Sequence, residues 1–87
     1  MAIIGGEVEQ LSALKASFEK HAGIVQELTS SLRAQLEATH WQGPTSERFR
    51  SVWTGEYEPV LRKLEMALIE AGHAVGLAKD RLVEAGS

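Results

Sequence analysis

The chain has 87 residues and no cysteine, and its 12 acidic and 9 basic side chains leave a net charge of −3. This length predicts one small domain, and the missing cysteines exclude a disulfide framework or a thiolate metal site. Because the basic residues are interleaved with acidic ones instead of gathering on one face, the charge pattern does not predict a nucleic-acid-binding surface.

The start of the chain and its apolar segments bear on localisation. Residues 1–6 are apolar but short, and the first basic residue is Lys15, so the pattern of a cleaved signal peptide is missing. No apolar run approaches the roughly 18 residues that a membrane span needs. We therefore expect a soluble chain that is made in the cytoplasm and, if it leaves the cell, does so without a cleaved signal.

A helical pattern begins at Glu7. Apolar residues recur at steps of three and four, the spacing of one helical face, and predict a helix over about 7–39. His21 falls within this apolar stripe, where protonation would place a charge in an apolar interface. The positions that we expect to pack in the core or in a dimer interface are Leu11, Leu14, Phe18, Val25, Leu28 and Leu32.

The strongest turn signal lies at mid-chain, over residues 40–44. Gly43 reaches positive φ at low cost, and Pro44 disfavours helical backbone at the residue before it while fitting the first turn of a new helix. We predict that a buried Trp41 fixes this bend together with Gly43. The alternative is an exposed Trp41 that serves as a recognition surface, because a tryptophan presents both apolar area and an N–H donor.

A second helical pattern follows and predicts a helix over about 45–83, capped by Thr45 or Ser46. Pro59 removes a backbone N–H inside this helix, and Gly55, four residues earlier, lets the backbone relax, so we expect a kink between these two residues. The packing positions expected here are Phe49, Trp53, Tyr57, Leu61, Leu64 and Leu68.

Two long helices joined by a short bend predict an all-α fold, a helix-turn-helix hairpin of antiparallel helices that forms a single domain over 1–87. The apolar stripes cover about three positions per heptad, which is wider than a two-helix seam requires. A second hairpin would cover the surplus, so we expect dimerisation into a four-helix bundle.

The residue pattern does not favour catalysis. His21, His40 and His73 lack the spacing of paired helical metal ligands, so we expect no metal site and no cofactor, and interpret them as packed or half-exposed side chains. There is no glycine-rich phosphate loop, and a thin hairpin has no cleft in which a base and its orienting partner would meet. We therefore expect a protein that is not an enzyme.

Trp41-Gln42-Gly43, placed at mid-chain between two helices, resembles the Trp-x-Gly (WXG, ESAT-6-like) family. Phe49 and Trp53 follow with the family's aromatic spacing, and Glu70-Ala71-Gly72 is similar to the small-residue stretch late in its second helix. The resemblance implies a homodimer, or a heterodimer with a related WXG protein. It also implies export in the folded state, without a signal peptide, by the type VII (ESX-like) secretion machinery, with virulence roles that vary among members.

The resemblance has one departure. Export in the family is usually directed by a Tyr-x-x-x-Asp/Glu motif just beyond the second helix, whereas the single tyrosine here is Tyr57. The leading interpretation is a secreted substrate or effector that acts through protein–protein interaction. The alternative is a non-enzymatic partner or targeting module that accompanies a larger toxin or a second WXG protein. Membrane disruption is unfavoured because the hairpin lacks a basic polar face.

Overall fold

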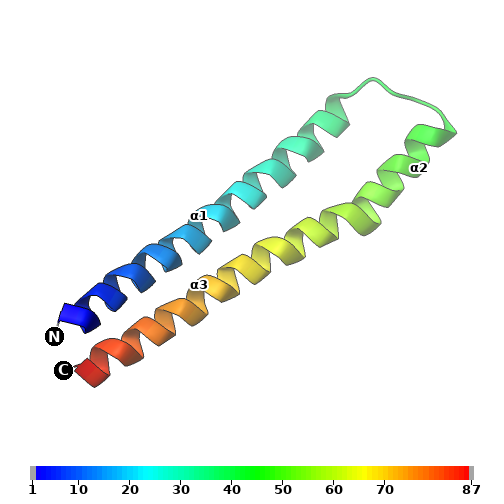
Figure 1. Cartoon of the computed structure of the whole chain (residues 1–87). Coiled ribbons are helices and arrows are strands. Elements are labelled where there is room, and N and C mark those ends of the chain that lie inside the picture. Colours follow the sequence, from blue (N-terminus) through cyan, green and yellow to red (C-terminus); the bar gives the residue numbers. More distant parts are fainter. Residues whose placement is uncertain (1, 87) are drawn as a thin grey trace.

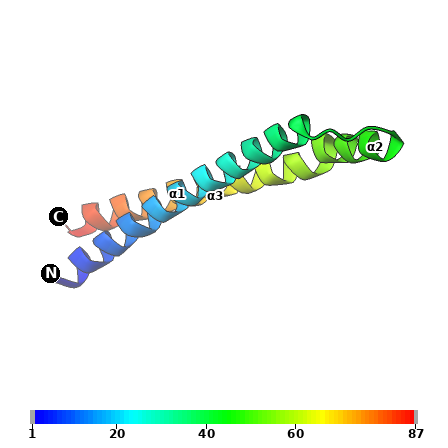
Figure 2. The ribbon, with the colours of Figure 1, turned by 90° about the horizontal axis from the view of Figure 1, so that it is seen from above.

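The computed structural model describes residues 2–86 and confirms the all-α hairpin. Helix α1 (Ala2–Ala38) forms the first arm, and α2 (Pro44–Val52), the π-helical turn η1 (Trp53–Tyr57) and α3 (Glu58–Gly86) form the second. The arms run antiparallel, so both ends of the chain lie together, opposite the bend (Figure 1). The molecule measures 66 × 17 × 12 Å, and the arms cross over one another along this length (Figure 2).

The arms are longer than the apolar pattern alone indicates. The first was expected over 7–39 and is Ala2–Ala38, whereas the second was expected over 45–83 and extends from Pro44 to Gly86 without a non-helical residue. The glycines at positions 5 and 6 lie inside α1. Each interior glycine costs about 1 kcal/mol relative to alanine, which is not enough to end a helix of 37 residues.

Small residues bring the arms together. Ala22 and Val25 of α1 are buried, and so are Gly72 and Gly76 of α3. A Cβ atom at position 72 would lie 3.3 Å from Cβ of Phe18, so the α3 backbone passes directly over this ring-bearing residue. Glycine allows this close approach, because a Cβ here would be tighter than an ordinary van der Waals contact and would require a shift of a few tenths of an ångström.

The second arm stays helical around Pro59, because a π-helical turn directly precedes this proline. The backbone N–H of Glu58 donates to the carbonyl of Trp53, five residues earlier, and so closes a wider turn immediately before the proline. A proline at position 59 cannot donate to the carbonyl of Gly55, and the π turn is placed where that bond is missing. Where a kink was expected, between Gly55 and Pro59, the structure has this π turn in an otherwise continuous helical arm.

A hairpin of two helices cannot cover its own apolar residues. Among the described side chains, Ala22 and Val25 are the buried hydrophobic ones, while large apolar side chains remain exposed from Leu14 to Val83. Burial of apolar area is the main driving force for folding and association. The fold therefore leaves many large apolar side chains exposed along the hairpin.

Candidate interaction site at the bend and along one flank

The bend between α1 and α2 ends at Gly43, which has a φ of 109° and precedes Pro44, the first residue of α2. Its carbonyl accepts the N–H of Glu47 at 3.0 Å, so the chain turns directly into the new helix. A side chain is strained at this φ, and the glycine of the Trp-x-Gly sequence is therefore required by the backbone.

Two polar residues of α2 hold the bend against the end of α1. Ser46 is 1% exposed, and its Oγ donates to the Trp41 carbonyl at 2.8 Å while accepting from Arg50 Nε at 3.0 Å. Arg50 Nη1 donates to the Leu36 carbonyl at 2.7 Å, and Nη2 donates to the Thr39 carbonyl at 3.1 Å. Because the last carbonyls of a helix lack intrahelical partners, Arg50 acts as the C-terminal cap of α1.

This bend lock of Ser46 and Arg50 was missed by sequence reasoning, which expected Thr45 or Ser46 to cap α2. Gly43 is the N-cap residue instead, without a side-chain hydrogen bond, and Ser46 faces back toward Trp41. The available signal was the four-residue spacing of Ser46 and Arg50 just after a helix end. Such a pair lies on one face of the second helix and can reach the unpaired carbonyls of the first.

Trp41 lies on the surface of the bend and is 39% exposed. Its ring centroid is 5.7 Å from that of Phe49, which is 6.4 Å from that of Tyr57, so three aromatic rings follow one another along the second arm. We call Trp41, Phe49 and Tyr57 the aromatic row. This exposure argues against the fully buried Trp41 that we predicted. It favours the alternative, an aromatic side chain on the surface.

A shallow groove lies beside the aromatic row. It has a volume of about 210 Å³, and its lining residues are Leu32, Gln35, Leu36, Thr39, Phe49 and Trp53. The groove places Leu32 of α1 and Phe49 of α2 on the same side of the hairpin. Exposed aromatic rings beside an apolar groove are typical of a surface that binds another protein.

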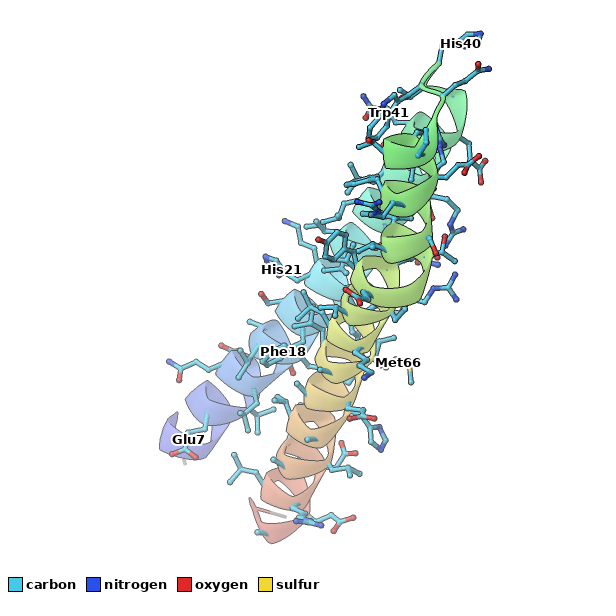
Figure 3. All side chains as sticks on the ribbon, turned by 90° about the vertical axis from the view of Figure 1, so that its right-hand side faces the viewer. Glu7, Phe18, His21, His40, Trp41 and Met66 are labelled. Atoms are coloured by element: carbon cyan, nitrogen blue, oxygen red, sulfur yellow. The ribbon has the colours of Figure 1, made fainter. Side chains whose placement is uncertain are left out.

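The same side continues along the middle of the hairpin as a surface without charge. Helical spacing forms one row of side chains on this side of each arm. The two rows contain no Asp, Glu, Lys or Arg between residues 10 and 35 of α1 and between residues 60 and 78 of α3. We call this surface the uncharged flank. Its principal residues are Leu14, His21, Leu28, Leu32 and Gln35 of α1 and Val60, Leu64, Leu68, Ala71 and Val75 of α3. Figure 3 shows His21 on this side and Met66 on the opposite one.

The predicted packing residues divide into two groups. Val25 is buried, and five are partly buried: Leu11, Phe18, Trp53, Leu61 and Leu68. The other six are exposed by 39–49%: Leu14, Leu28, Leu32, Phe49, Tyr57 and Leu64. The first group lies at the seam between the arms, where Leu68 also borders the uncharged flank, and the second lies on the uncharged flank and in the aromatic row.

The opposite side carries the ion pairs. Glu58, which is 8% exposed, accepts from Arg33 Nε at 2.7 Å and from Trp53 Nε1 at 3.3 Å, and Arg62 Nη2 lies 3.4 Å from its second oxygen. The Arg33 hydrogen bond lowers the pKa of Glu58 against the opposing effect of burial, and the same bond raises the pKa of Arg33. This cluster ties α1 to the start of α3.

His21 and His73 lie on opposite sides of the hairpin. His21 is exposed, with Nδ1 2.7 Å from the carbonyl oxygen of Ser17, whereas His73 lines a groove with Lys15 and Glu65 on the opposite side. Within residues 2–86, no three histidine or carboxylate side chains gather as ligands of a metal ion would. None of the helices in that range is both long and apolar enough to cross a bilayer.

Comparisons of this chain with protein-family models, with curated proteins and with solved structures found no match. What defines the molecule is its architecture: a two-helix antiparallel hairpin with a Trp-x-Gly bend and an uncovered apolar side. This architecture is consistent with a WXG protein but is not specific to that family.

Proposed function

We propose that the chain is a WXG-type protein of a type VII (ESX-like) secretion system and acts as a secreted substrate or effector through protein–protein interaction. The observation that carries the proposal is the exposed Trp41, held at the bend of a long hairpin two residues before a glycine with a φ of 109°. The Trp-x-Gly sequence thus supplies both an exposed aromatic and the backbone conformation that presents it.

The bend lock supports a recognition role for Trp41. Its carbonyl accepts the Ser46 hydroxyl, and Ser46 is in turn held by Arg50, so the backbone that bears the indole is fixed before any partner arrives. A preorganised side chain loses less conformational entropy on binding. Tryptophan is also among the residues most enriched at the energetic centres of protein interfaces.

The uncharged flank supports pairing of two hairpins. A surface without charges is covered without burying an unpaired ion, which would cost several kcal/mol. In an isologous pair the same patch of each subunit meets its copy, so a charged patch would place like charges against one another. The uncharged flank avoids this repulsion and is therefore self-complementary. We propose a dimer of four helices, made from two copies of this chain or from this chain and a related WXG protein.

Export is tested in a bacterium that has a type VII system and in a matched strain that lacks it. The tagged chain should accumulate outside the first strain only, while a cytoplasmic marker stays inside both. Trp41→Ala should lower the extracellular amount at unchanged intracellular amount, whereas Trp41→Phe, which keeps an aromatic ring, should retain most of it. Equal extracellular amounts in both strains would contradict the proposal.

The alternative role, a partner or targeting module, gives a different result in the same assay. The chain would then appear outside the cell only when a second WXG protein or a toxin from the same locus is expressed with it. Purification of the tagged chain from that strain would recover the partner in stoichiometric amount.

Pairing is tested by light scattering on matched variants. The wild-type chain should have twice its 9.5 kDa mass, Leu28→Asp on the uncharged flank should be monomeric, and Met66→Asp on the opposite side should remain dimeric. Both residues are exposed in the single hairpin, at 39% and 55%, so neither aspartate is buried within one chain. A monomeric wild type would contradict pairing of two copies of this chain and leave the pair with a related WXG protein. Equal behaviour of the two variants of a dimeric chain would contradict pairing through this flank.

A further inference from the structure

His21 is the one histidine of the uncharged flank between residues 10 and 35 of α1 and 60 and 78 of α3. It lies seven residues from Leu14 and from Leu28, and all three side chains are exposed. Helical geometry places residues at this spacing on one side of α1. A molecule that covers the two leucines therefore also covers the imidazole.

One ring nitrogen of His21 is committed within the chain. Nδ1 lies 2.7 Å from the Ser17 carbonyl oxygen, which can only accept, so Nδ1 carries the hydrogen and donates it. Nε2 has no hydrogen-bond partner within the described residues. Protonation of the imidazole therefore adds its proton at Nε2, the nitrogen that is free to meet a second molecule.

No carboxylate is placed to offset that charge. On α1 the neighbouring ions are Lys20, which is exposed, and Glu19, which pairs with Lys15. The contact of Phe18 with position 72 brings residues 68–71 of α3 opposite His21. Among these, Glu70 is the single charged residue and is exposed, without an ion pair to His21.

We propose that His21 makes the pairing of two copies of this chain sensitive to pH, with the neutral imidazole in the dimer and the imidazolium favouring separate chains. This inference rests on the proposed pairing through the uncharged flank. A second copy is the occupant that fits, because a flank without charge on either arm complements itself. An isologous dimer buries two His21 side chains, so protonation places two charges in one apolar interface.

The direction of the effect follows from proton linkage. In the proposed dimer the cost of burying a charge disfavours the imidazolium, so pairing should be stronger at the higher pH and weaken as the pH is lowered. With two sites per dimer, we expect the dissociation constant to rise by about tenfold or more between pH 7.5 and pH 5.5.

Sedimentation equilibrium at about pH 7.5 and about pH 5.5, at one ionic strength, tests the inference. Three chains are compared: the wild type, His21→Leu, and His73→Leu, which alters a histidine of the opposite side. The wild type and His73→Leu should lose affinity at the lower pH, whereas His21→Leu should dimerise equally at both. Circular dichroism at both pH values checks that the helices persist.

Two results separate this inference from the pairing on which it rests. A wild type that is monomeric at pH 7.5 would overturn the proposed dimer and the role of His21 with it. A wild type that dimerises with the same affinity at both pH values would leave the dimer standing and overturn the role of His21. The same conclusion would follow if His21→Leu kept the pH dependence of the wild type.

Discussion

Arg50 of α2 closes the end of α1, since its Nη1 donates to the carbonyl of Leu36 at 2.7 Å. Two residues fourteen positions apart thereby join the arms at the bend. The last carbonyls of an exposed helix are ordinarily left to water or to a glycine motif. Here the second helix supplies a side-chain cap for the first, and one guanidinium group donates to the carbonyls of both Leu36 and Thr39.

We predict that Arg50→Ala lowers the free energy of unfolding by about 2 kcal/mol, the usual range for hydrogen bonds made by a charged group. Arg48→Ala is the matched control, because Arg48 is exposed and makes no hydrogen bond or ion pair with the described residues. Urea unfolding followed by circular dichroism, at equal protein concentration, measures both. Equal losses in the two variants would show that Arg50 does not cap α1.

Two glycines should respond to alanine with opposite signs. Gly43→Ala should destabilise the fold by about 1–3 kcal/mol, because the φ of 109° strains any side chain. Gly23→Ala should stabilise it by up to about 1 kcal/mol, since this glycine lies inside α1 and a new Cβ would meet no atom within 4 Å. Thermal unfolding gives both signs, and a stabilising Gly43→Ala would contradict the strained bend.

At the seam between the arms, a methyl group should be tolerated at Gly76, whereas a larger side chain at Gly72 should destabilise the fold. A Cβ at position 76 meets only the flexible end of Lys15, which can move aside, whereas one at position 72 meets Cβ of Phe18 at 3.3 Å. We expect Gly72→Val to cost about 1–3 kcal/mol through overpacking and Gly76→Ala to be neutral or stabilising. Equal destabilisation by both would mean that the arms do not keep this register.

The ion pair of Arg33 and Glu58 should make stability depend on pH in the acid range. Because the pKa of Glu58 is lowered in the folded chain, its carboxylate stabilises the fold above about pH 4.3, the ordinary value for glutamate, and this contribution is lost as the pH falls through the lower folded value. Glu58→Gln should therefore melt at a lower temperature than the wild type at neutral pH, and the difference should shrink as the pH falls below the ordinary range of a glutamate.

Glu56→Gln is the control for this prediction, because Glu56 is exposed and has no ion-pair partner among the described residues. Its melting temperature should equal that of the wild type across the same pH range. A Glu58→Gln variant that differs from the wild type by the same amount at neutral and acid pH would show that the ion pair is not the source of the pH dependence.

Trp41→Ala should cost only about 1–2 kcal/mol of folding stability. The ring is 39% exposed and its described ring contact is with Phe49, and one aromatic pair with partial burial contributes in this range. Equilibrium unfolding of Trp41→Ala and Trp41→Phe measures the loss. A loss of about 4 kcal/mol, as expected for a fully buried aromatic, would instead identify Trp41 as a core residue.

The spacing of apolar residues was sufficient to predict the two arms, because a stripe at steps of three and four has one stable solution in water, an amphipathic helix. Gly43-Pro44 was likewise sufficient to place the bend, since glycine and proline act on their own backbone. These features are local, and they were read from neighbouring residues alone. The stripes also showed that more apolar surface exists than two helices can bury.

The sequence could not show which apolar side chains are buried between the arms, or which polar side chains bond across them. Leu28 and Val25 occupy the same stripe, yet Val25 is buried between the arms and Leu28 lies exposed on the uncharged flank, because the rotation of α1 about its axis is set by the close approach of α3 at Gly72. Arg50 reaches Leu36, and Arg33 reaches Glu58, only because the arms stand in one register. Periodicity determines which residues share a helix face, but only packing between distant segments decides what that face meets.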